Sequence, residues 1–350
     1  MKTFQKLKQN PELWQAYWVR ERVIDAIREY FKGRGFHEVE TPLLLPVPSS
    51  EPYLEVFQTE LKDDVGHTRP AFLPTSPEYA LKKLLAAGSG SIFEITKSFR
   101  NGEGKSSRHN PEFTIMEWYE VGGNYMSVLA EMERLIAFIY QKVLQSSSVP
   151  VLQYQGKKYS LKTPWEKISV AEAFQKYAGI GAETMLDGQR LKEYGLQHGY
   201  QVTAETTWEE IWNQIIANEI EPHLGVRGPT VLYDYPVAQA VLSKKAKDPR
   251  FAERWELYLG GLELANCYGE LTDAAEVETR FAHDMAERKR LGKTQYGVDD
   301  DFVAALKMGM PECSGIAVGI DRLAMLFADV ANIDEVRFFP ASELYHTPGV

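Results

Sequence analysis

The chain has 350 residues, of which 44% are hydrophobic, so it is long enough for one large domain with an insert or for two modest domains. No apolar run approaches the ~20 residues of a membrane-spanning helix, and no signal-peptide stretch follows the first lysines, which predicts a cytoplasmic protein without a membrane partner. The net charge is −10 without any basic block, which argues against nucleic acid, and Cys267 and Cys313 show neither a disulfide framework nor zinc-ligand spacing.

Two helices are predicted in the first quarter of the chain. Residues 12–33 place Val23, Ile27 and Phe31 on one apolar face and end in glycine. Residues 75–87 form a second helix, opened by the sequence TSPE, whose proline suits a first-turn position. The glutamate of TSPE is placed to complete a capping box, which gives it a structural role beside any role in binding.

A basic loop between two alternating strands is the most informative feature of the chain. Upstream, SIFEITKSFR alternates apolar and polar residues, and downstream FTIMEWY directs every second side chain from Phe113 to Tyr119 to one face. The resulting antiparallel hairpin would hold Arg100 at its mouth and Arg108 and His109 on its loop, a set that suits a triphosphate and a purine. An exposed charged hairpin is the alternative interpretation, since arginines near strand ends are common.

Beyond this hairpin the chain is predicted to be mostly helical. Residues 125–145 predict a helix, residues 146–160 a serine-rich connector and residues from about 166 to 228 a helical insert. Apolar residues of the insert recur at helical spacing and are expected to form its core: Trp208, Ile211, Trp212, Ile215 and Ile216. No chemistry is assigned to the insert.

A second dense region spans residues 253–272, ERWELYLGGLELANCYGELT. Its double glycine predicts a two-residue hairpin turn, and simple pairing places Glu256 and Glu263 on one face. Facing carboxylates repel each other unless a cation lies between them, so a magnesium ion bridging ATP phosphates is the natural partner. An exposed acidic strand pair is the alternative.

Strand parity complicates this second region. Asn266, Tyr268 and Glu270 have the opposite parity to Glu263, so simple alternation directs them to the other face. A single site that contains all of these residues therefore needs a bulge or a longer loop between residues 260 and 266. Spacing alone does not decide this.

Three segments resemble the three motifs of class II aminoacyl-tRNA synthetases of the lysyl type. FRNGEGKSSRHNPEFTIMEWY resembles motif 2, CSGIAVGIDRLAML resembles motif 3, and FHEVETP resembles motif 1, the dimer-forming element. Their order and spacing also fit, so the resemblance covers nearly the whole chain. It implies an α/β (α+β) fold, in which a mostly antiparallel sheet of six or seven strands is flanked by helices. It also implies a single catalytic domain over residues 1–350 and a homodimer.

The resemblance further implies a set of residues that bind ATP. Arg100 is expected to hold the substrate carboxylate beside the α-phosphate, and it forms the catalytic pair with Arg322. Phe113 and Arg322 are expected to sandwich the adenine, and Glu256 and Glu263 to bind Mg²⁺. The complete set implied for ATP is Arg100, Glu103, Arg108, His109, Asn110, Phe113, Glu256, Glu263 and Arg322.

A second set is implied for a lysine-like substrate. Glu117, Tyr119 and Glu270 are expected around the distal ammonium, where each charged hydrogen bond contributes on the order of 1.5–3 kcal/mol. Glu78 is expected at the amine next to the carboxylate, and Asn266 at the carboxylate itself. The complete set implied for the substrate is Ser76, Glu78, Arg100, Glu117, Tyr119, Asn266, Glu270 and Ala317.

Departures from the lysyl-tRNA synthetase pattern bear on the function. The sequence begins at the helix before motif 1, so no anticodon-binding domain is expected. In addition, Ala317 replaces a glycine, Thr75 and Ser76 replace an apolar pair, and residues 233–245 differ from the lysyl-tRNA synthetase pattern. These features resemble a branch of free-standing ligases that attach (R)-β-lysine to elongation factor P. The hypothesis is that the methyl group at 317 favours a substrate whose amino group has moved by one carbon. The motif 2 loop is one residue longer than in either group, which leaves the place of Glu103 at ATP open.

The expected function is ATP-dependent activation of lysine or (R)-β-lysine as an aminoacyl-adenylate, followed by transfer to a lysine side chain of elongation factor P. A truncated lysyl-tRNA synthetase that charges tRNA would share every catalytic residue and is the main alternative. A small-molecule ligase of the asparagine-synthetase type would not need the Glu117 and Glu270 pair. A non-catalytic paralogue would be expected to lose Arg100, Glu263 or Arg322, and all three are present.

Overall fold

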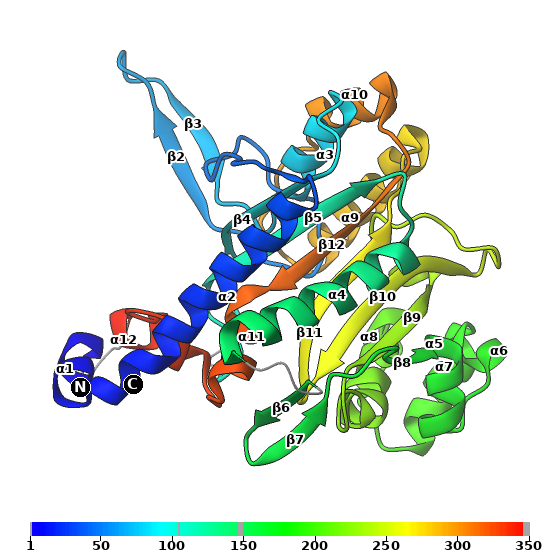
Figure 1. Ribbon diagram of the computed structural model, residues 1–350. Coiled ribbons are helices and arrows are strands. Elements are labelled where there is room, and N and C mark those ends of the chain that lie inside the picture. The colour runs from blue at the N-terminus through cyan, green and yellow to red at the C-terminus, as the bar shows by residue number, and fades with distance from the viewer. Residues whose placement is uncertain (1, 104–105, 146–149, 346–350) are drawn as a thin grey trace.

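An eight-stranded sheet forms the centre of the computed structural model, which describes residues 2–103, 106–145 and 150–345 (Figure 1). From one edge to the other, its strands are β1 (His37–Glu38), β4 (Ile92–Phe99), β5 (Glu112–Val121), β12 (Cys313–Gly319), β11 (Leu262–Gly269), β10 (Phe251–Leu259), β9 (Thr230–Pro236) and β8 (Glu166–Ser169). The inner strands pair antiparallel, whereas β1 pairs parallel with β4 and β8 pairs parallel with β9. The predicted mostly antiparallel sheet flanked by helices is therefore confirmed.

The predicted count of six or seven strands is too low, because both edge strands are short. β1 contains two residues and β8 contains four. Strands of this length show little alternation, and β8 begins a segment whose later residues have strong helical periodicity. The two parallel edge strands, β1 and β8, therefore could not be recognised from the sequence pattern.

Three helices cover one face of the sheet: α2 (Trp14–Gly33), α4 (Tyr125–Leu144) and α11 (Ile320–Ala328) (Figure 1). The helices predicted over residues 12–33 and 125–145 are confirmed, with a 3₁₀ turn at Pro11–Leu13 before the first. Phe31 of α2 packs its ring 5.2 Å from Phe93 and 4.9 Å from Trp118, which point from β4 and β5 to this face. The main hydrophobic core therefore lies between these helices and the sheet.

The opposite face carries a second group of helices: α3 (Glu78–Ala86), α9 (Ala274–Arg290) and α10 (Asp300–Gly309). Tyr79 stacks on Phe302 at 4.4 Å, and both belong to a smaller core with Ile92 of the sheet. The predicted capping box at α3 is wrong, because Pro77 is the N-cap and no side chain caps the helix there. Glu78 instead directs its carboxylate to Lys82, one turn further along the helix.

The predicted helical insert packs against the β8–β9–β10 edge of the sheet. After β8 it contains α5 (Val170–Ala173), α6 (Ala182–Met185), α7 (Gly188–Gln197) and α8 (Trp208–Ile215), with helical turns at Phe174–Ala178, Ile216–Ile220 and Glu221–His223. Ile211, Trp212, Ile215 and Ile216 are buried in one cluster with residues of β9 and β10, and Trp208 packs against that cluster. The core residues predicted for the insert are therefore confirmed.

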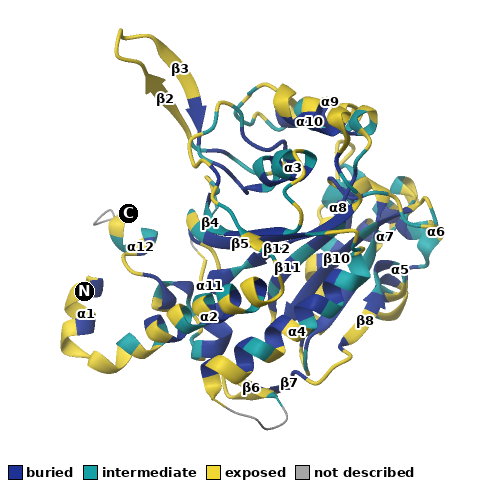
Figure 2. Cartoon of the chain, turned by 45° about the horizontal axis from the view of Figure 1, so that its top comes forward, coloured by how far each residue is buried: buried dark blue, intermediate teal, exposed yellow. Residues whose placement is uncertain are grey.

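Two small hairpins and two terminal helices complete the described chain. The remaining elements are α1 (Thr3–Gln9), β2 (Gln58–Lys62) with β3 (Thr68–Phe72), β6 (Val151–Tyr154) with β7 (Lys157–Ser160), and α12 (Ala341–Leu344), with 3₁₀ turns at Val237–Gln239 and Ile333–Val336. The expected connector over residues 146–160 thus contains a hairpin, and residues 146–149 lie outside the described part. Figure 2 shows buried inner strands and a largely exposed β2–β3 hairpin. Within the described ranges, no helix is both long and apolar enough to cross a membrane.

Candidate active site

A β-bulge settles the parity problem of the β10–β11 hairpin. Tyr258 pairs with Glu263 next to the two-glycine turn, but Leu257 pairs with Ala265, so Leu264 is the extra residue. From the bulge onward, alternation changes face, and Asn266 joins Glu263 on the same side of the sheet. The predicted two-residue turn is confirmed, and of the two alternatives that the sequence left open between residues 260 and 266, a bulge or a longer loop, the structure has the bulge.

A pocket of about 400 Å³ opens on this face, between β5, β12, β11 and β10 and the segments before α3 and after β4. Every residue that the sequence predicts for ATP, metal or substrate lines it. These residues are Ser76, Glu78, Arg100, Glu103, Arg108, His109, Asn110, Phe113, Glu117, Tyr119, Glu256, Glu263, Asn266, Glu270, Ala317 and Arg322. Their roles remain predictions, but their location in one cavity is a property of the fold.

A row of cross-strand neighbours forms the floor of the pocket. Glu256 pairs with Asn266, Asn266 with Ala317, and Ala317 with Glu117, so these four side chains point to one face across four strands. The methyl group of Ala317 therefore lies between the predicted carboxylate contact and a predicted ammonium contact. This placement fits the hypothesis that residue 317 shapes the pocket around the amino end of the substrate.

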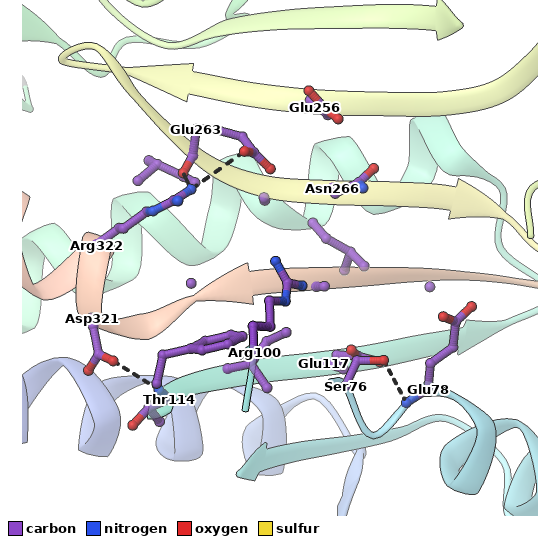
Figure 3. Close-up of a pocket in the computed structure, with 18 of the residues that line it drawn as sticks. Ser76, Glu78, Arg100, Thr114, Glu117, Glu256, Glu263, Asn266, Asp321 and Arg322 are labelled. Carbon is purple, nitrogen blue, oxygen red and sulfur yellow. Dashed lines mark hydrogen bonds and ion pairs between the residues drawn. The ribbon is translucent and has the colours of Figure 1, made fainter. Parts of the chain in front are cut away.

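Arg100 projects into the middle of the pocket from the end of β4. Figure 3 shows its side chain between the end containing Arg322 and Glu263 and the end containing Glu78 and Glu117. Its Nε is buried without a hydrogen-bond partner among the described residues. A buried guanidinium nitrogen with a free hydrogen suits an anionic ligand, because an unpaired buried polar atom is otherwise costly.

The Arg322 end of the pocket is built from α11 and the loop after β4. The Nη1 of Arg322 donates to the carbonyl of Glu263 at 2.8 Å, and its Nη2 lies 2.8 Å from Nε2 of His109. Burial lowers the pKa of His109, and the positive charge of Arg322 lowers it further, so a neutral imidazole accepts this hydrogen bond. On the same loop, Arg108 donates to the carbonyl of Gly261 at 2.8 Å.

Two residues that the sequence predicts to contact the nucleotide already make contacts within the protein. The guanidinium carbon of Arg100 lies 5.1 Å from the centre of the Phe113 ring, a face that the sequence interpretation reserves for adenine. Asn110 uses its carbonyl to accept a hydrogen bond from the backbone nitrogen of Ala341, and its amide donates to the carbonyl of Glu112. Asn110 therefore fixes the loop and the C-terminal segment in addition to lining the pocket.

Glu256 and Glu263 fit the magnesium role assigned to them. Burial raises the pKa of Glu263, and the nearby Glu256 carboxylate raises it further, which is the repulsion that a cation would relieve. Glu256 meanwhile accepts hydrogen bonds at 2.6 Å from Arg254 and from the hydroxyl of Tyr258. No group of three or more acidic, histidine or cysteine ligands occurs within the described ranges, so phosphate and water oxygens would complete the coordination, as is usual for Mg²⁺.

The amine end of the pocket contains buried carboxylates. Tyr119 donates its hydroxyl to Glu117 at 3.1 Å, and burial together with the charge of Glu78 holds the pKa of Glu117 well above its usual range. Glu270 lies beside Gly315, where an added Cβ would overlap its carboxylate and the ring of Tyr119. Glycine at 315 is therefore required for these two side chains to occupy their positions.

Some residues at the site were not predicted from the sequence. Lys82 is fully buried, with its Nζ 2.6 Å from Glu78 and 2.6 Å from Glu270, and its position four residues after Glu78 was a usable signal. Arg254 binds Glu256 and Asn266, and its shared parity with Glu256 was a second signal. Glu51 lines the pocket from a loop, and no pattern in the sequence marks it.

Comparison with known protein families assigns the chain to a family. Residues 2–343 match the family model of class II tRNA synthetases (D, K and N). The chain therefore belongs to the class II tRNA synthetase family, with the sheet and motif order that the sequence predicted.

Within this family, the chain is similar to two kinds of ligase. It is 34% identical over 335 residues to the lysine–tRNA ligase of Moorella thermoacetica, and the matched region covers 95% of this chain but only 66% of that protein. It is 35% identical over 336 residues to the elongation factor P–(R)-β-lysine ligase of Mannheimia succiniciproducens, covering 94% of this chain and 97% of that protein. The corresponding ligase of Avibacterium paragallinarum is 37% identical over 330 residues, covering 93% of this chain and 95% of that protein.

Proposed function

We propose that this protein activates lysine or (R)-β-lysine with ATP and Mg²⁺ and transfers the aminoacyl group to a lysine side chain of elongation factor P. The observation that carries this proposal is a single pocket with Arg100 at its middle, arginines and carboxylates suited to a nucleotide at one end, and buried carboxylates suited to amines at the other. Similarity over nearly the full length of relatives named elongation factor P–(R)-β-lysine ligases supports the choice of acceptor.

The first step joins the substrate to AMP. A carboxylate oxygen of the amino acid attacks the α-phosphorus, an acyl–phosphate bond forms, and the bond to the bridging oxygen of the β-phosphate breaks to release pyrophosphate. Two anions approach each other in this step, so the guanidinium of Arg100 between them favours the transition state. Magnesium, when bound by Glu256 and Glu263, would neutralise charge on the phosphates.

The second step transfers the aminoacyl group. The neutral amine of the acceptor lysine attacks the acyl carbon, an amide bond forms, and AMP leaves with the electron pair of the broken bond while the amine releases a proton. No enzyme nucleophile is needed in either step. The contribution of the protein is therefore the position of the substrates and the neutralisation of their charge.

The carboxylates at the amine end support a substrate with two amino groups. Glu78, Glu117 and Glu270 line this end, whereas one buried cation, Lys82, is paired with two of them. Each of two substrate ammonium groups would therefore find a carboxylate partner at this end of the pocket. An amino acid with a neutral side chain would leave a buried carboxylate without a partner, which is the basis for its rejection.

Pyrophosphate exchange tests the activation step. The purified protein would be given ATP, Mg²⁺ and labelled pyrophosphate with (R)-β-lysine, lysine or norleucine, which lacks the distal amine. We expect exchange with a lysine isomer and none above background with norleucine. Equal exchange with norleucine, or no exchange with any amino acid, would contradict the proposal.

Charging of tRNA is the second candidate, and the 34% identity to a lysine–tRNA ligase favours its consideration. Both candidates use the same activation step, so exchange does not separate them. The acceptor separates them, because one reaction labels a protein and the other labels RNA.

We also propose a homodimer in the cytoplasm. The large apolar side chains of Trp18, Leu43, Leu44 and Phe339 are exposed in the single chain, and Leu43 and Leu44 directly follow the segment that resembles motif 1. Their burial against a second copy would remove this apolar surface from water. Sedimentation equilibrium tests this, and a monomer at micromolar concentration would contradict it.

A further inference from the structure

Lys82 lies directly behind the amine end of the pocket. Its side chain has 0% exposure, and its Nζ lies 2.6 Å from Oε1 of Glu78 and 2.6 Å from Oε2 of Glu270. Glu78 begins α3, one turn before Lys82, whereas Glu270 directly follows β11. One ammonium therefore joins two elements that each supply a carboxylate to the pocket.

The charges around this ammonium explain why it is needed. Glu270 is 1% exposed and Glu117 is 3% exposed, so ionised carboxylates here have little contact with water. Buried ionised groups are strongly destabilising without a partner of opposite charge. Burial alone would lower the pKa of Lys82, but its contacts with Glu270 and Glu78 outweigh that effect and raise it, so Lys82 stays charged. The other titratable groups close enough to interact electrostatically with this trio are Glu51, Tyr79, Glu117, Tyr119, Cys267, Tyr268 and Cys313.

We propose that Lys82 is a positioning residue, whose ammonium bridges the carboxylates of Glu78 and Glu270 and holds them at a fixed separation for a substrate with two amino groups. The inference rests on the proposed function, because it concerns the same substrate. Lys82 is not among the residues that line the pocket, so it acts through the two carboxylates. Since one ammonium holds both, its loss affects recognition of both amino groups together.

The kinetic test compares Lys82→Met, Lys82→Arg and a matched control, Lys83→Met. Lys83 is the next residue of α3, is 34% exposed and pairs with Asp299 at 2.7 Å, so this control removes a paired lysine that faces away from the pocket. We expect Lys82→Met to raise the KM for the lysine isomer at least about tenfold and to change the KM for ATP less than about twofold. Lys82→Arg should recover most of the loss, and Lys83→Met should resemble the wild type.

The pH dependence distinguishes positioning from packing. Without Lys82, the Glu270 carboxylate is harder to ionise, because the charge of Lys82 no longer opposes the rise in its pKa that burial causes. The KM of Lys82→Met for the lysine isomer should therefore fall steadily between pH of about 7 and about 9, more steeply than in the wild type. The positioning role would be overturned if Lys82→Met raised the KM for ATP as much as the KM for the lysine isomer. It would also be overturned if the KM of this variant for the lysine isomer did not depend on pH.

Thermal unfolding of the ligand-free protein separates this inference from the proposed function. If Lys82 compensates the buried charge of Glu270, the fall in melting temperature caused by Lys82→Met grows as pH rises from about 5 to about 8, because Glu270 becomes an unpaired buried charge as it ionises. A fall that is the same at every pH would overturn the role of Lys82, whatever the activity of the wild type. If the wild type were inactive but the fall in melting temperature caused by Lys82→Met depended on pH, only the proposed function would be overturned.

Discussion

The carboxylate of Asp321 accepts a hydrogen bond from the backbone nitrogen of Thr114 at 2.8 Å (Figure 3). The same oxygen binds Nη1 of Arg337 at 2.6 Å, and the other oxygen binds Nε of Arg20 at 3.1 Å. This buried carboxylate thus ties the start of α11 to β5, to α2 and to the C-terminal segment. Because Arg322 is the next residue, the same contacts place its guanidinium over the pocket.

Replacing Asp321 with asparagine should destabilise the fold. The amide keeps the shape but removes the negative charge, so Arg20 loses its acidic partner and Arg337 keeps only Glu112. Breaking a buried pair in this way costs about 3–5 kcal/mol. Urea unfolding measures the change, with Asp25→Asn on the exposed side of α2 as a control expected to stay within about 0.5 kcal/mol of the wild type. Equal effects of the two substitutions would show that the Asp321 contacts contribute no special stability.

Replacing Arg100 with alanine should abolish adenylate formation without unfolding the protein. Its guanidinium is the group expected between the two reacting anions, and loss of one such donor lowers the rate by about 10²–10³ or more. Pyrophosphate exchange and circular dichroism measure the two effects, with Arg69→Ala on the exposed β3 strand as the control. Wild-type exchange in the Arg100→Ala variant would refute the catalytic assignment.

Replacing Ala317 with glycine should move the preference of the enzyme toward ordinary lysine. The methyl group lies in the cross-strand row between Asn266 and Glu117, so its removal opens space near the amino end of the substrate. One methyl group in a pocket changes selectivity by about 10–200-fold, and we expect a shift near the lower limit. The measurement is the ratio of kcat/KM for the two isomers, and an unchanged ratio would count against this account of the pocket.

Replacing Glu263 with glutamine should weaken the use of magnesium. The amide removes the repulsion with Glu256 but also one anionic ligand, so a higher Mg²⁺ concentration, by at least about tenfold, should be needed for half-maximal exchange. Removal of Mg²⁺ with EDTA should stop exchange in the wild type. An unchanged magnesium dependence in the variant would place the metal elsewhere.

Substrate affinity should fall in mild acid. Burial raises the pKa of Glu270 to about 7, and the charge of Lys82 partly opposes this effect. The carboxylate is ionised above this pKa and protonates below it, so the KM for the lysine isomer should rise as pH falls from about 8 to about 6. A KM for the lysine isomer that stays constant over this range would show that Glu270 does not contact a substrate ammonium.

Local sequence patterns could predict much of the site, because its main elements are strands with regular alternation. The parity conflict between Glu263 and Asn266 indicated either a bulge or a longer loop, and the pairing of Leu257 with Ala265 shows a bulge. The double glycine likewise predicted the tight turn that brings Glu256 and Glu263 together.

Contacts that arise only after packing were not predictable in the same way. Lys82 reaches Glu270, which is distant in sequence, and Glu51 enters the pocket from an irregular loop. The TSPE pattern predicted a capping box, but the buried Lys82 draws the Glu78 carboxylate away from the helix start. These arrangements depend on contacts between segments that are distant in sequence, and no short-range pattern records them.

The most direct test of the central claim is the identity of the acceptor. The protein would be incubated with ATP, Mg²⁺ and labelled (R)-β-lysine or lysine, with elongation factor P in one reaction and bulk tRNA in another. Our account predicts label on a lysine of elongation factor P, lost in the Arg100→Ala variant, and none on tRNA. Label on tRNA and none on the factor would contradict it and would identify the protein as a tRNA-charging enzyme.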